Sequence, residues 1–316
     1  MACLRTVLLA ALLCCAIATA QAEVVVRDDT GATVRLPVPA RRIVSLVPHA
    51  TENLFAAGAG DRIVGVVEYS DYPEAAKRIT RVGDYAHPDL EAIAALKPDL
   101  VVVWQSGQAA LVRRIASLGL PVFQTQPDRL EDIPGNIEKF GRLAGSEAVA
   151  RRVAADFRQR LAALRQRYSA RPNVAVFYQA WNRPLLTVGG SQIISDVIRL
   201  CGGTNLFARL AAKAPSVSVE AVLAADPEAI IASRMGAETE VGLDAWRRWT
   251  QLRAVKRGNL FAIPADLLQR PTPRLLDGAE QLCRDLETAR GRRWTGVRLT
   301  PHASPLRNKP LPALRF

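Results

Sequence analysis

SEAVARRVAADFRQRLAALRQRY, residues 146–168, divides this chain of 316 residues near its middle. Apolar side chains recur in it every three or four positions with Arg, Gln and Asp between them, which is the period of an amphipathic α-helix with one buried stripe. The stripe comprises Val149, Val153, Phe157, Leu161 and Leu164. Ser146 followed by Glu147 suits a helix start, and Pro172 opposes continuation. We therefore predict one long helix over residues 146–170.

The segments on either side of this helix resemble each other. LEAIAALKPDLVVV lies before it and VEAVLAADPEAIIA lies after it, so that Glu91 matches Glu220 and Pro98 matches Pro227. Each segment has the pattern of a helix, a turn and a buried strand. We interpret them as an internal repeat, with chance similarity between two helix-turn-strand units as the alternative.

Strands and helices alternate along both halves of the chain. Strand patterns occur at IVSLV, RIVGVVEY, VVVW and PVFQTQ in the first half and at NVAVFYQA, AIIAS and NLFAIP in the second. Such alternation indicates parallel sheets covered by helices on both faces. We expect an α/β fold with two Rossmann-like lobes, residues 23–145 and 171–290, joined by one rigid helix. A ligand cleft is expected between the lobes, at the carboxyl ends of the strands.

The N-terminus has the pattern of a secretory signal peptide over residues 1–22. Arg5 supplies the positive charge, a short apolar run follows, and Ala20-Gln21-Ala22 forms a cleavage site. A membrane anchor is the alternative, but the run is shorter than the roughly 20 residues that a span needs. Cleavage would leave Cys201 and Cys283 as the remaining cysteines. In an oxidising compartment two thiols suggest one disulfide, with two separate buried thiols as the alternative.

The net charge of +12 is concentrated at the C-terminus. Residues 291–316 carry six basic side chains, no acidic ones and four prolines. We predict a disordered basic tail that contacts anionic lipid headgroups. Nucleic acid is the other partner for such a tail, but export argues against it.

Aromatic and charged side chains follow several of the predicted strands. They are Tyr69, Tyr72, Tyr85, Trp104, Trp181, Asp266 and Arg270. Aromatic rings with one acid and one base at loop tips suit a large, partly flat ligand that carries amides or charge. Catalytic machinery has no candidate: Gly58-Ala59-Gly60 follows a helix and lacks the third glycine of a dinucleotide site, and no nucleophile elbow or Walker loop is present. A binding protein is therefore favoured over an enzyme.

RIVSLVPHATENLFAAGAGDRIVGVVEYSDYP, LEAIAALKPDLVVVW, LCGGTNLF and PRLLDGAEQLC resemble a known family across about residues 40–290. It is the helical-backbone (class III) periplasmic binding protein family, and within it the vitamin B12 (cobalamin)-binding proteins of bacterial ABC importers. The resemblance implies a monomeric periplasmic carrier without a cofactor of its own. It would capture cobalamin or a related corrinoid and deliver it to a membrane permease dimer. A haem or siderophore-iron carrier on the same fold is the alternative.

The resemblance also assigns roles to individual residues. Aromatic ligand contacts are implied for Tyr69, Tyr85 and Trp104, polar ligand contacts for Asp266 and Arg270, permease docking for Glu91 and Glu220, and a disulfide for Cys201 with Cys283. Two aromatic residues of the family's second lobe are replaced by Leu186 and Ala214, so that face of the pocket is either flatter or covered by Trp181 instead.

His49 stands where the family has alanine, just after the first strand. A neutral imidazole there can approach the axial position of cobalt or iron in the ligand, although no metal site of the protein itself is predicted. A hydrogen-bonded loop histidine is the alternative.

Overall fold

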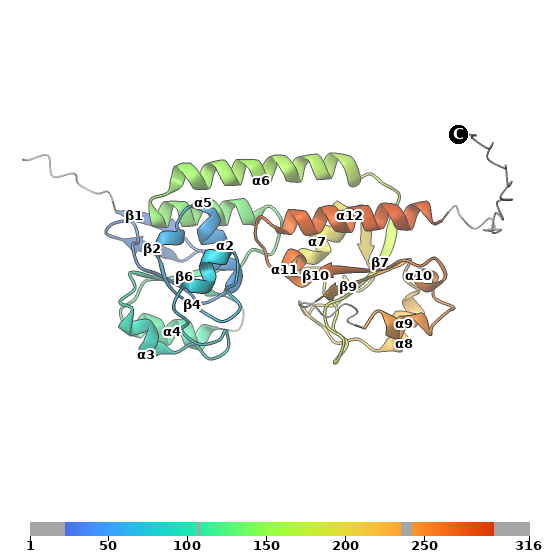
Figure 1. The fold of residues 1–316 in the computed structure, drawn as a ribbon, viewed down its shortest axis with the longest axis horizontal. Coiled ribbons are helices and arrows are strands. Elements are labelled where there is room, and N and C mark those ends of the chain that lie inside the picture. Colours follow the sequence, from blue (N-terminus) through green and yellow to red (C-terminus); the bar gives the residue numbers. More distant parts are fainter. Residues whose placement is uncertain (1–22, 106–107, 235–241, 294–316) are drawn as a thin grey trace, which may run out of the picture.

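The computed structural model describes residues 23–105, 108–234 and 242–293. The predicted signal peptide and the predicted tail beyond residue 293 lie outside the described residues. Two lobes lie side by side, and one long helix, α6 (Glu147–Tyr168), runs along both of them (Figure 1). No helix in these described ranges is long and apolar enough to cross a membrane.

The first lobe is built on a parallel sheet with the order β4-β3-β5-β6. Its strands are β3 (Ile43–Ser45), β4 (Ile63–Val66), β5 (Leu100–Trp104) and β6 (Val122–Thr125). Its helices are α2 (Pro48–Ala56), α3 (Leu90–Ala95), α4 (Ala109–Ser117) and α5 (Asp132–Ala144), with short 3-10 turns η1 (Gly60–Arg62) and η2 (Glu74–Arg78). An antiparallel hairpin of β1 (Val24–Arg27) and β2 (Thr33–Leu36) precedes this sheet.

The second lobe has a parallel sheet with the order β10-β9-β7-β8. Its strands are β7 (Val174–Gln179), β8 (Gly203–Asn205), β9 (Ala229–Arg234) and β10 (Leu260–Pro264). Its helices are α7 (Ile193–Leu200), α8 (Val219–Ala225), α9 (Asp244–Arg247), α10 (Arg253–Lys256), α11 (Ala265–Leu268) and α12 (Leu275–Gly291). Within each lobe the first strand of the parallel sheet pairs with the second on one side and the third on the other. The predicted fold class is confirmed.

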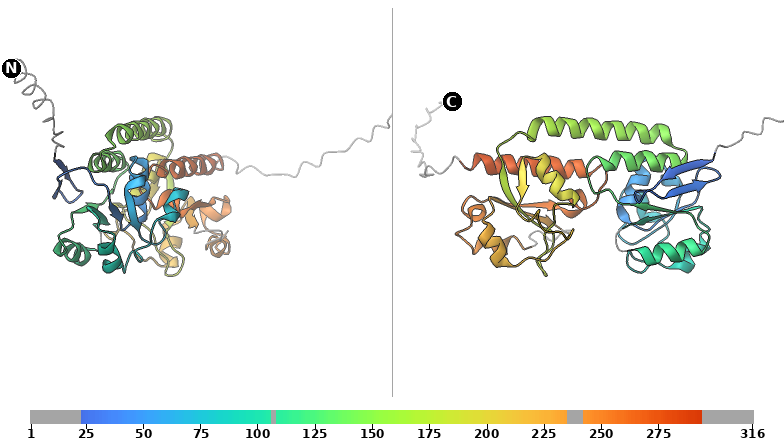
Figure 2. Two further views of the ribbon diagram at one scale, coloured as in Figure 1. Left: turned by 60° about the vertical axis from the view of Figure 1, so that its left-hand side comes forward. Right: turned by 180° about the vertical axis from the view of Figure 1, so that it is seen from behind.

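One face of α6 packs on both lobes. Its buried side chains are Ala150, Ala154, Phe157, Leu161, Leu164 and Tyr168, while Val149 and Val153 of the predicted stripe are half-buried. α5 of the first lobe and α12 of the second lobe both lie beneath α6, as two views from opposite sides show (Figures 1 and 2). Ser146 precedes the helix as predicted, but its Oγ donates to the carbonyl of Ala57, 2.7 Å away, and does not cap α6. The helix start is thereby fastened to the end of α2.

The internal repeat has matching turns. α3 and α8 both begin after a residue whose side chain accepts backbone N–H groups of the first turn, Asp89 and Ser218. Both helices are followed by a non-glycine residue with positive φ, Lys97 at 45° and Asp226 at 42°. Since few residues adopt this conformation without cost, its recurrence at equivalent positions argues against chance similarity.

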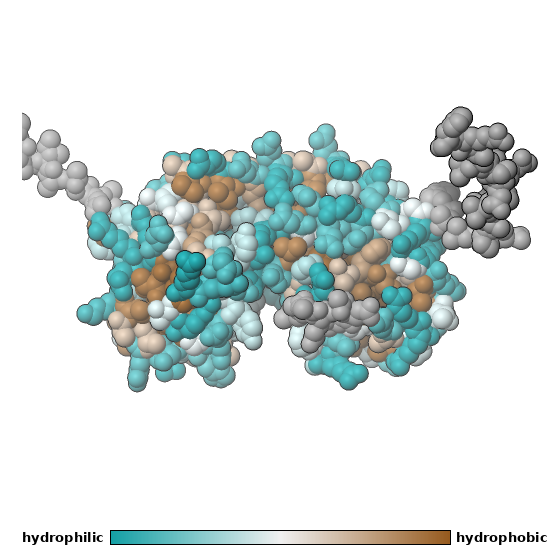
Figure 3. All heavy atoms as spheres, viewed as in Figure 1, coloured by the Kyte–Doolittle hydropathy of each residue, from teal (hydrophilic) through white to brown (hydrophobic). Residues whose placement is uncertain are grey.

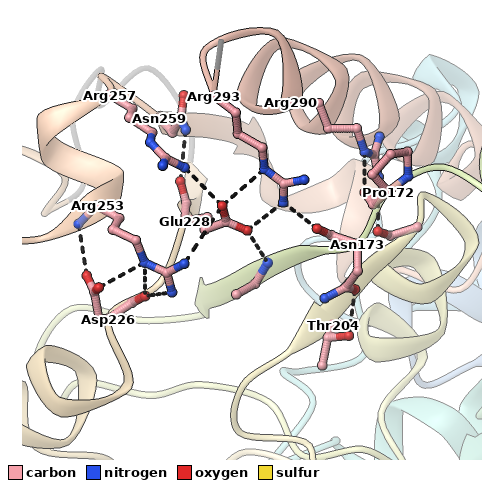
Figure 4. A network of polar contacts seen from close by, with 12 residues as sticks. Pro172, Asn173, Thr204, Asp226, Glu228, Arg253, Arg257, Asn259, Arg290 and Arg293 are labelled. Atoms are coloured by element: carbon pink, nitrogen blue, oxygen red, sulfur yellow. Dashed lines mark hydrogen bonds and ion pairs between the residues drawn. The ribbon is translucent and has the colours of Figure 1, made fainter. Parts of the chain in front are cut away.

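A carboxylate completes the turn in each lobe. Asp99 accepts from the backbone N–H groups of Arg41 and Arg42, at 2.8 and 3.0 Å, just before β3. The equivalent Glu228 accepts from the N–H of Ala175 in β7, 3.3 Å away. Around Glu228 this arrangement is extended by the guanidinium groups of Arg253, Arg257 and Arg293 (Figure 4). Each carboxylate therefore ties the third strand of its sheet to the first.

The C-terminal helix closes the second lobe. Cys201, at the end of α7, forms a disulfide with Cys283 of α12, as predicted. α12 reaches Gly291, and Arg292 donates to the carbonyl of Gly258 while Arg293 pairs with Glu228. The end of α12 and the two residues after it are thus fastened to the second lobe, because these side chains satisfy groups at the edge of the sheet.

Two glycines of α5 provide a test of the contact between α5 and α6. A Cβ at Gly141 would lie 2.2 Å from the Cβ of Ala150, whereas a Cβ at Gly135 would meet nothing within 4 Å. We expect Gly141→Ala to lower the free energy of unfolding by about 1–3 kcal/mol through overpacking. Gly135→Ala should raise it by about 0.5–1 kcal/mol through helix propensity. Urea unfolding of both variants measures this, and a shift of the same sign for both would contradict the close packing.

Candidate ligand-binding cleft

The carboxyl ends of the strands in both lobes border a crevice. In the first lobe the strand order reverses between β3 and β5, and in the second between β7 and β9. Connections that leave such neighbours in opposite directions open a crevice at that point. The surface is hollowed between the two lobes on the side away from α6 (Figure 3). Candidate ligand contacts should therefore follow β3, β5, β7 and β9.

Three rings meet at the reversal point of the first lobe. The imidazole of His49, which follows β3, lies edge-on to the indole of Trp104 at the end of β5, with ring centroids 5.6 Å apart. The ring of Tyr85 lies 5.6 Å from the same indole on a tilted plane. Gln108 donates to the carbonyl of Tyr85, 2.8 Å away, and burial raises the pKa of the Tyr85 hydroxyl. The predicted residues His49, Tyr85 and Trp104 thus form one continuous group, which we call the aromatic row.

Tyr69 stands apart from this row. Its side chain is 77% exposed, and its backbone has a φ of 62°, a conformation that is strained for an aromatic residue. The carbonyl of the following Ser70 accepts from both terminal nitrogens of Arg81, at 3.2 Å each. The loop is therefore held by its main chain, while the ring of Tyr69 remains available to a ligand.

His49 lies in the first turn of α2, not in a loop, and is 4% exposed. Its Nε2 is buried and has no hydrogen-bond partner within the described part of the chain. Burial lowers the pKa of His49 to about 3, helped by the charge of Arg270 and opposed by that of Asp29. The imidazole is therefore neutral near pH 7, and its Nε2 is not engaged by any described residue.

In the second lobe, polar side chains gather near the carboxyl ends of β7 and β9. The hydroxyl of Tyr178 in β7 hydrogen-bonds to Ser233 in β9, and Gln269 donates to the same Ser233 oxygen, 2.8 Å away. Trp181 follows β7, is 44% exposed, and pairs with Leu186 through the backbone. The substituted position Leu186 therefore lies beside Trp181.

Arg270 pairs across the lobe boundary. Its Nη1 donates to Glu52 Oε1 at 2.9 Å and to Asp71 Oδ1 at 2.7 Å, and its Nη2 donates to the carbonyl of Tyr69 at 3.1 Å. Burial lowers the pKa of Arg270, but the hydrogen bonds and charges of Asp71 and Glu52 outweigh it and raise the pKa overall. Asp266 lies half-buried in the first turn of α11. The sequence analysis missed Glu52, although an acid inside the short apolar helix ATENLFAA was a signal that it is buried with a partner.

The two acids predicted to dock on a permease occupy equivalent places. Glu91 and Glu220 are exposed in the first turns of α3 and α8. Both helices lie on the side of their lobe away from α6 (Figure 1). Within the described residues, no group of three or more His, Cys, Asp and Glu side chains is arranged to hold a metal ion.

Two parallel-sheet lobes, one joining helix and a crevice between strand ends define a two-lobed ligand-binding protein. The chain belongs to the periplasmic binding protein family, whose model matches residues 43–267. The predictions of this family and of a binding protein rather than an enzyme are thereby confirmed. Members of this family deliver ligands to ABC importer permeases.

Several known proteins are similar to this chain. A vitamin B12-binding protein of Vibrio cholerae is 40% identical over 255 residues, which cover 80% of this chain and 91% of that protein. One from Yersinia pestis is 35% identical over 249 residues, covering 78% and 86%. The crystal structure of the periplasmic vitamin B12-binding protein of Vibrio cholerae matches with a TM-score of 0.74 at 39% identity, covering 80% of this chain and 98% of that one. A periplasmic heme-binding protein of Pseudomonas aeruginosa matches with a TM-score of 0.68 at 26% identity, covering 77% and 91%.

The burial of His49 predicts an acid-sensitive fold. With a pKa of about 3 in the folded state and 6.5 as the ordinary value, the unfolded state binds the proton first as pH falls. The free energy of unfolding therefore keeps its full value above pH 6.5 and falls below it. At pH 5 the loss from His49 amounts to about 2 kcal/mol. Urea unfolding of His49→Asn between pH 7.5 and 5 should show a pH dependence smaller by this amount. The exposed His87→Asn serves as the control and should keep the wild-type dependence.

Proposed function

We propose that this protein captures cobalamin or a related corrinoid in the cleft and presents it to the permease of an ABC importer. The observation that carries the proposal is the aromatic row of His49, Trp104 and Tyr85 at the strand-order reversal of the first lobe. The partly exposed rings of Trp104 and Tyr85 offer an apolar, polarisable surface of the kind that a large macrocycle contacts, and the buried ring of His49 packs behind them. The relatives named vitamin B12-binding proteins support the choice of ligand.

The remaining contacts come from both sides of the cleft. Tyr69 contributes its exposed ring from the first lobe, and Trp181 contributes its ring from the second. Asp266 and Arg270 bind polar groups at the rim of the ligand, Arg270 through the N–H donors of its guanidinium group. The protein binds its ligand as a monomer and without chemistry.

A haem or ferric siderophore is the second candidate ligand. The unengaged Nε2 of His49 favours it, because a neutral imidazole is a common axial ligand of iron and cobalt. The similarity to a heme-binding protein on this fold supports it as well. However, His49 is 4% exposed, so its ring would have to turn into the cleft before it could coordinate a metal.

The location follows from the N-terminus and the cysteines. We propose that residues 1–22 direct export and are removed, and that the mature protein works in the periplasm of a Gram-negative cell. The disulfide between Cys201 and Cys283 suits that oxidising compartment. The basic tail beyond residue 293 would contact anionic lipid headgroups of the membrane.

Titration with two ligands tests the proposed function. Purified, oxidised residues 23–316 should bind cyanocobalamin tightly with one-to-one stoichiometry and hemin weakly, as followed by tryptophan quenching and the visible spectrum. Trp104→Ala should weaken cobalamin binding roughly 30-fold, because truncation of a central aromatic contact costs about 2 kcal/mol. Trp249→Phe, which alters an indole that packs under Arg248 in the second lobe, is the control. Tight binding of hemin without binding of cyanocobalamin would show that the proposed ligand is wrong, while the assignment of the cleft as the binding site would stand.

Charge reversal tests the docking role of Glu91 and Glu220. Glu91→Lys and Glu220→Lys should leave cobalamin affinity within about twofold of wild type, because exposed rim charges govern encounter and register. Each should reduce complex formation with the reconstituted importer by about tenfold or more, and the double variant should reduce it further. Asp156→Lys, an equal charge change on an exposed position of α6, controls for net charge. Loss of cobalamin binding in either variant would show that these acids belong to the ligand site.

A further inference from the structure

One carboxylate of the first lobe holds two guanidinium groups of the second. Glu52 lies in α2, and its side chain is 2% exposed. Its Oε1 accepts from Arg270 Nη1 at 2.9 Å and from Arg274 Nη2 at 2.8 Å, and its Oε2 accepts from Arg274 Nε at 2.9 Å. Charge-assisted hydrogen bonds of this kind, with two parallel bonds to Arg274, fix orientation as well as distance.

The neighbouring residues strengthen this contact between the lobes. Asn53, next to Glu52, donates from Nδ2 to the carbonyl of Pro271, 3.0 Å away. Pro271 and Pro273 restrict the backbone between Arg270 and Arg274, since each fixes its own φ. α2 is therefore joined to a stiff segment of the second lobe that leads into α12.

Arg270 has a second carboxylate partner in a different environment. Asp71 Oδ1 accepts from the same Nη1 atom, 2.7 Å away, but the Asp71 side chain is 44% exposed. Asp71 belongs to the loop that carries Tyr69, and the Tyr69 carbonyl accepts from Arg270 Nη2. Two carboxylates thus share Nη1, which has one hydrogen for each. Glu52 is buried and is also held by Arg274, whereas Asp71 is open to solvent.

We propose that Glu52 is a positioning residue, which fixes Arg270, Arg274 and the spacing of the lobes, and that Asp71 is an exchangeable partner. Asp71 yields Arg270 to an acceptor oxygen of the ligand, such as a peripheral amide or phosphate oxygen, whereas Glu52 keeps the guanidinium in place during this exchange. The ligand half of the proposal rests on the proposed function, and the spacing half does not.

The two carboxylates should therefore have opposite effects on ligand affinity. Removing the charge of Glu52 leaves two partly buried guanidinium groups without their common partner, which is costly and frees them to reorient. Removing Asp71 loses only a solvent-screened pair of small net value. It also removes the group that competes with the ligand for Arg270.

Binding measurements separate these roles. With cyanocobalamin as the probe in isothermal titration, Glu52→Gln should lower affinity at least tenfold, and Asp71→Ala should raise it about two- to fivefold. Arg274→Gln removes one partner of Glu52 and is expected to lower affinity as well. It serves as a second variant if Glu52→Gln folds poorly. Glu74→Ala is the matched control, because Glu74 is an exposed acid near Asp71 that pairs with the exposed Lys77. A loss of affinity in Asp71→Ala would overturn the exchange, and unchanged affinity in Glu52→Gln would overturn the positioning role.

The lobe spacing is measured without any ligand. Spin labels on Ala116→Cys in α4 and Ala245→Cys in α9, both exposed positions, report the distance between the lobes by pulsed electron resonance. The distance distribution should broaden in Glu52→Gln and Arg274→Gln and should match wild type in Asp71→Ala and Glu74→Ala. An unchanged distribution in Glu52→Gln would overturn the spacing role. If wild type binds no cobalamin, the proposed function fails, and this measurement alone decides the role of Glu52.

Discussion

The packing of a single apolar stripe of α6 on both lobes is the constraint on which the cleft depends. The stripe from Ala150 to Tyr168 belongs to one continuous core that includes side chains of both sheets. The approach of α5 to α6 is so close that Gly141 faces Ala150 without room for a Cβ. Because burial of apolar surface drives this packing, the lobes cannot separate along α6 without exposing its stripe to water.

The internal repeat places the same helix-turn-strand unit on both sides of the cleft. Each lobe reverses its strand order at the same place and carries a left-handed residue before its third strand. Asp99 and Glu228 then tie that strand to the first strand of the sheet. With the turn fixed in this way, the preceding helices α3 and α8 present Glu91 and Glu220 from equivalent positions. Two equivalent acids on one face are what a partner with approximate two-fold symmetry would contact.

The sequence predicted those parts of the fold that local pattern controls. The alternation of strands and helices, the long helix and the cysteine pair are all found. The helix α5 was missed, because Pro134, Gly135 and Gly141 interrupt its pattern; it forms because Ile137 and Phe140 are buried in the core. The strand β8, with the sequence Gly-Thr-Asn, has little strand propensity of its own and exists through its pairing with β7.

The site was predicted less completely than the fold, because part of it depends on contacts that local sequence pattern does not encode. Positions after strands were found, since parallel strands bring their carboxyl ends to one edge. The pairing of Glu52 with Arg270 joins residues 218 positions apart across two lobes, and no local pattern encodes it. A buried ion pair of this kind contributes little stability beyond what apolar side chains of equal volume would supply. The pair instead fixes the geometry of the contact between the lobes. It also affects the charge of the cleft. Burial is the main cause of the lowered pKa of His49, and the nearby charge of Arg270 lowers it further. Near neutral pH the polar chemistry at this edge of the cleft therefore depends on the two guanidinium groups and the two carboxylates that share them.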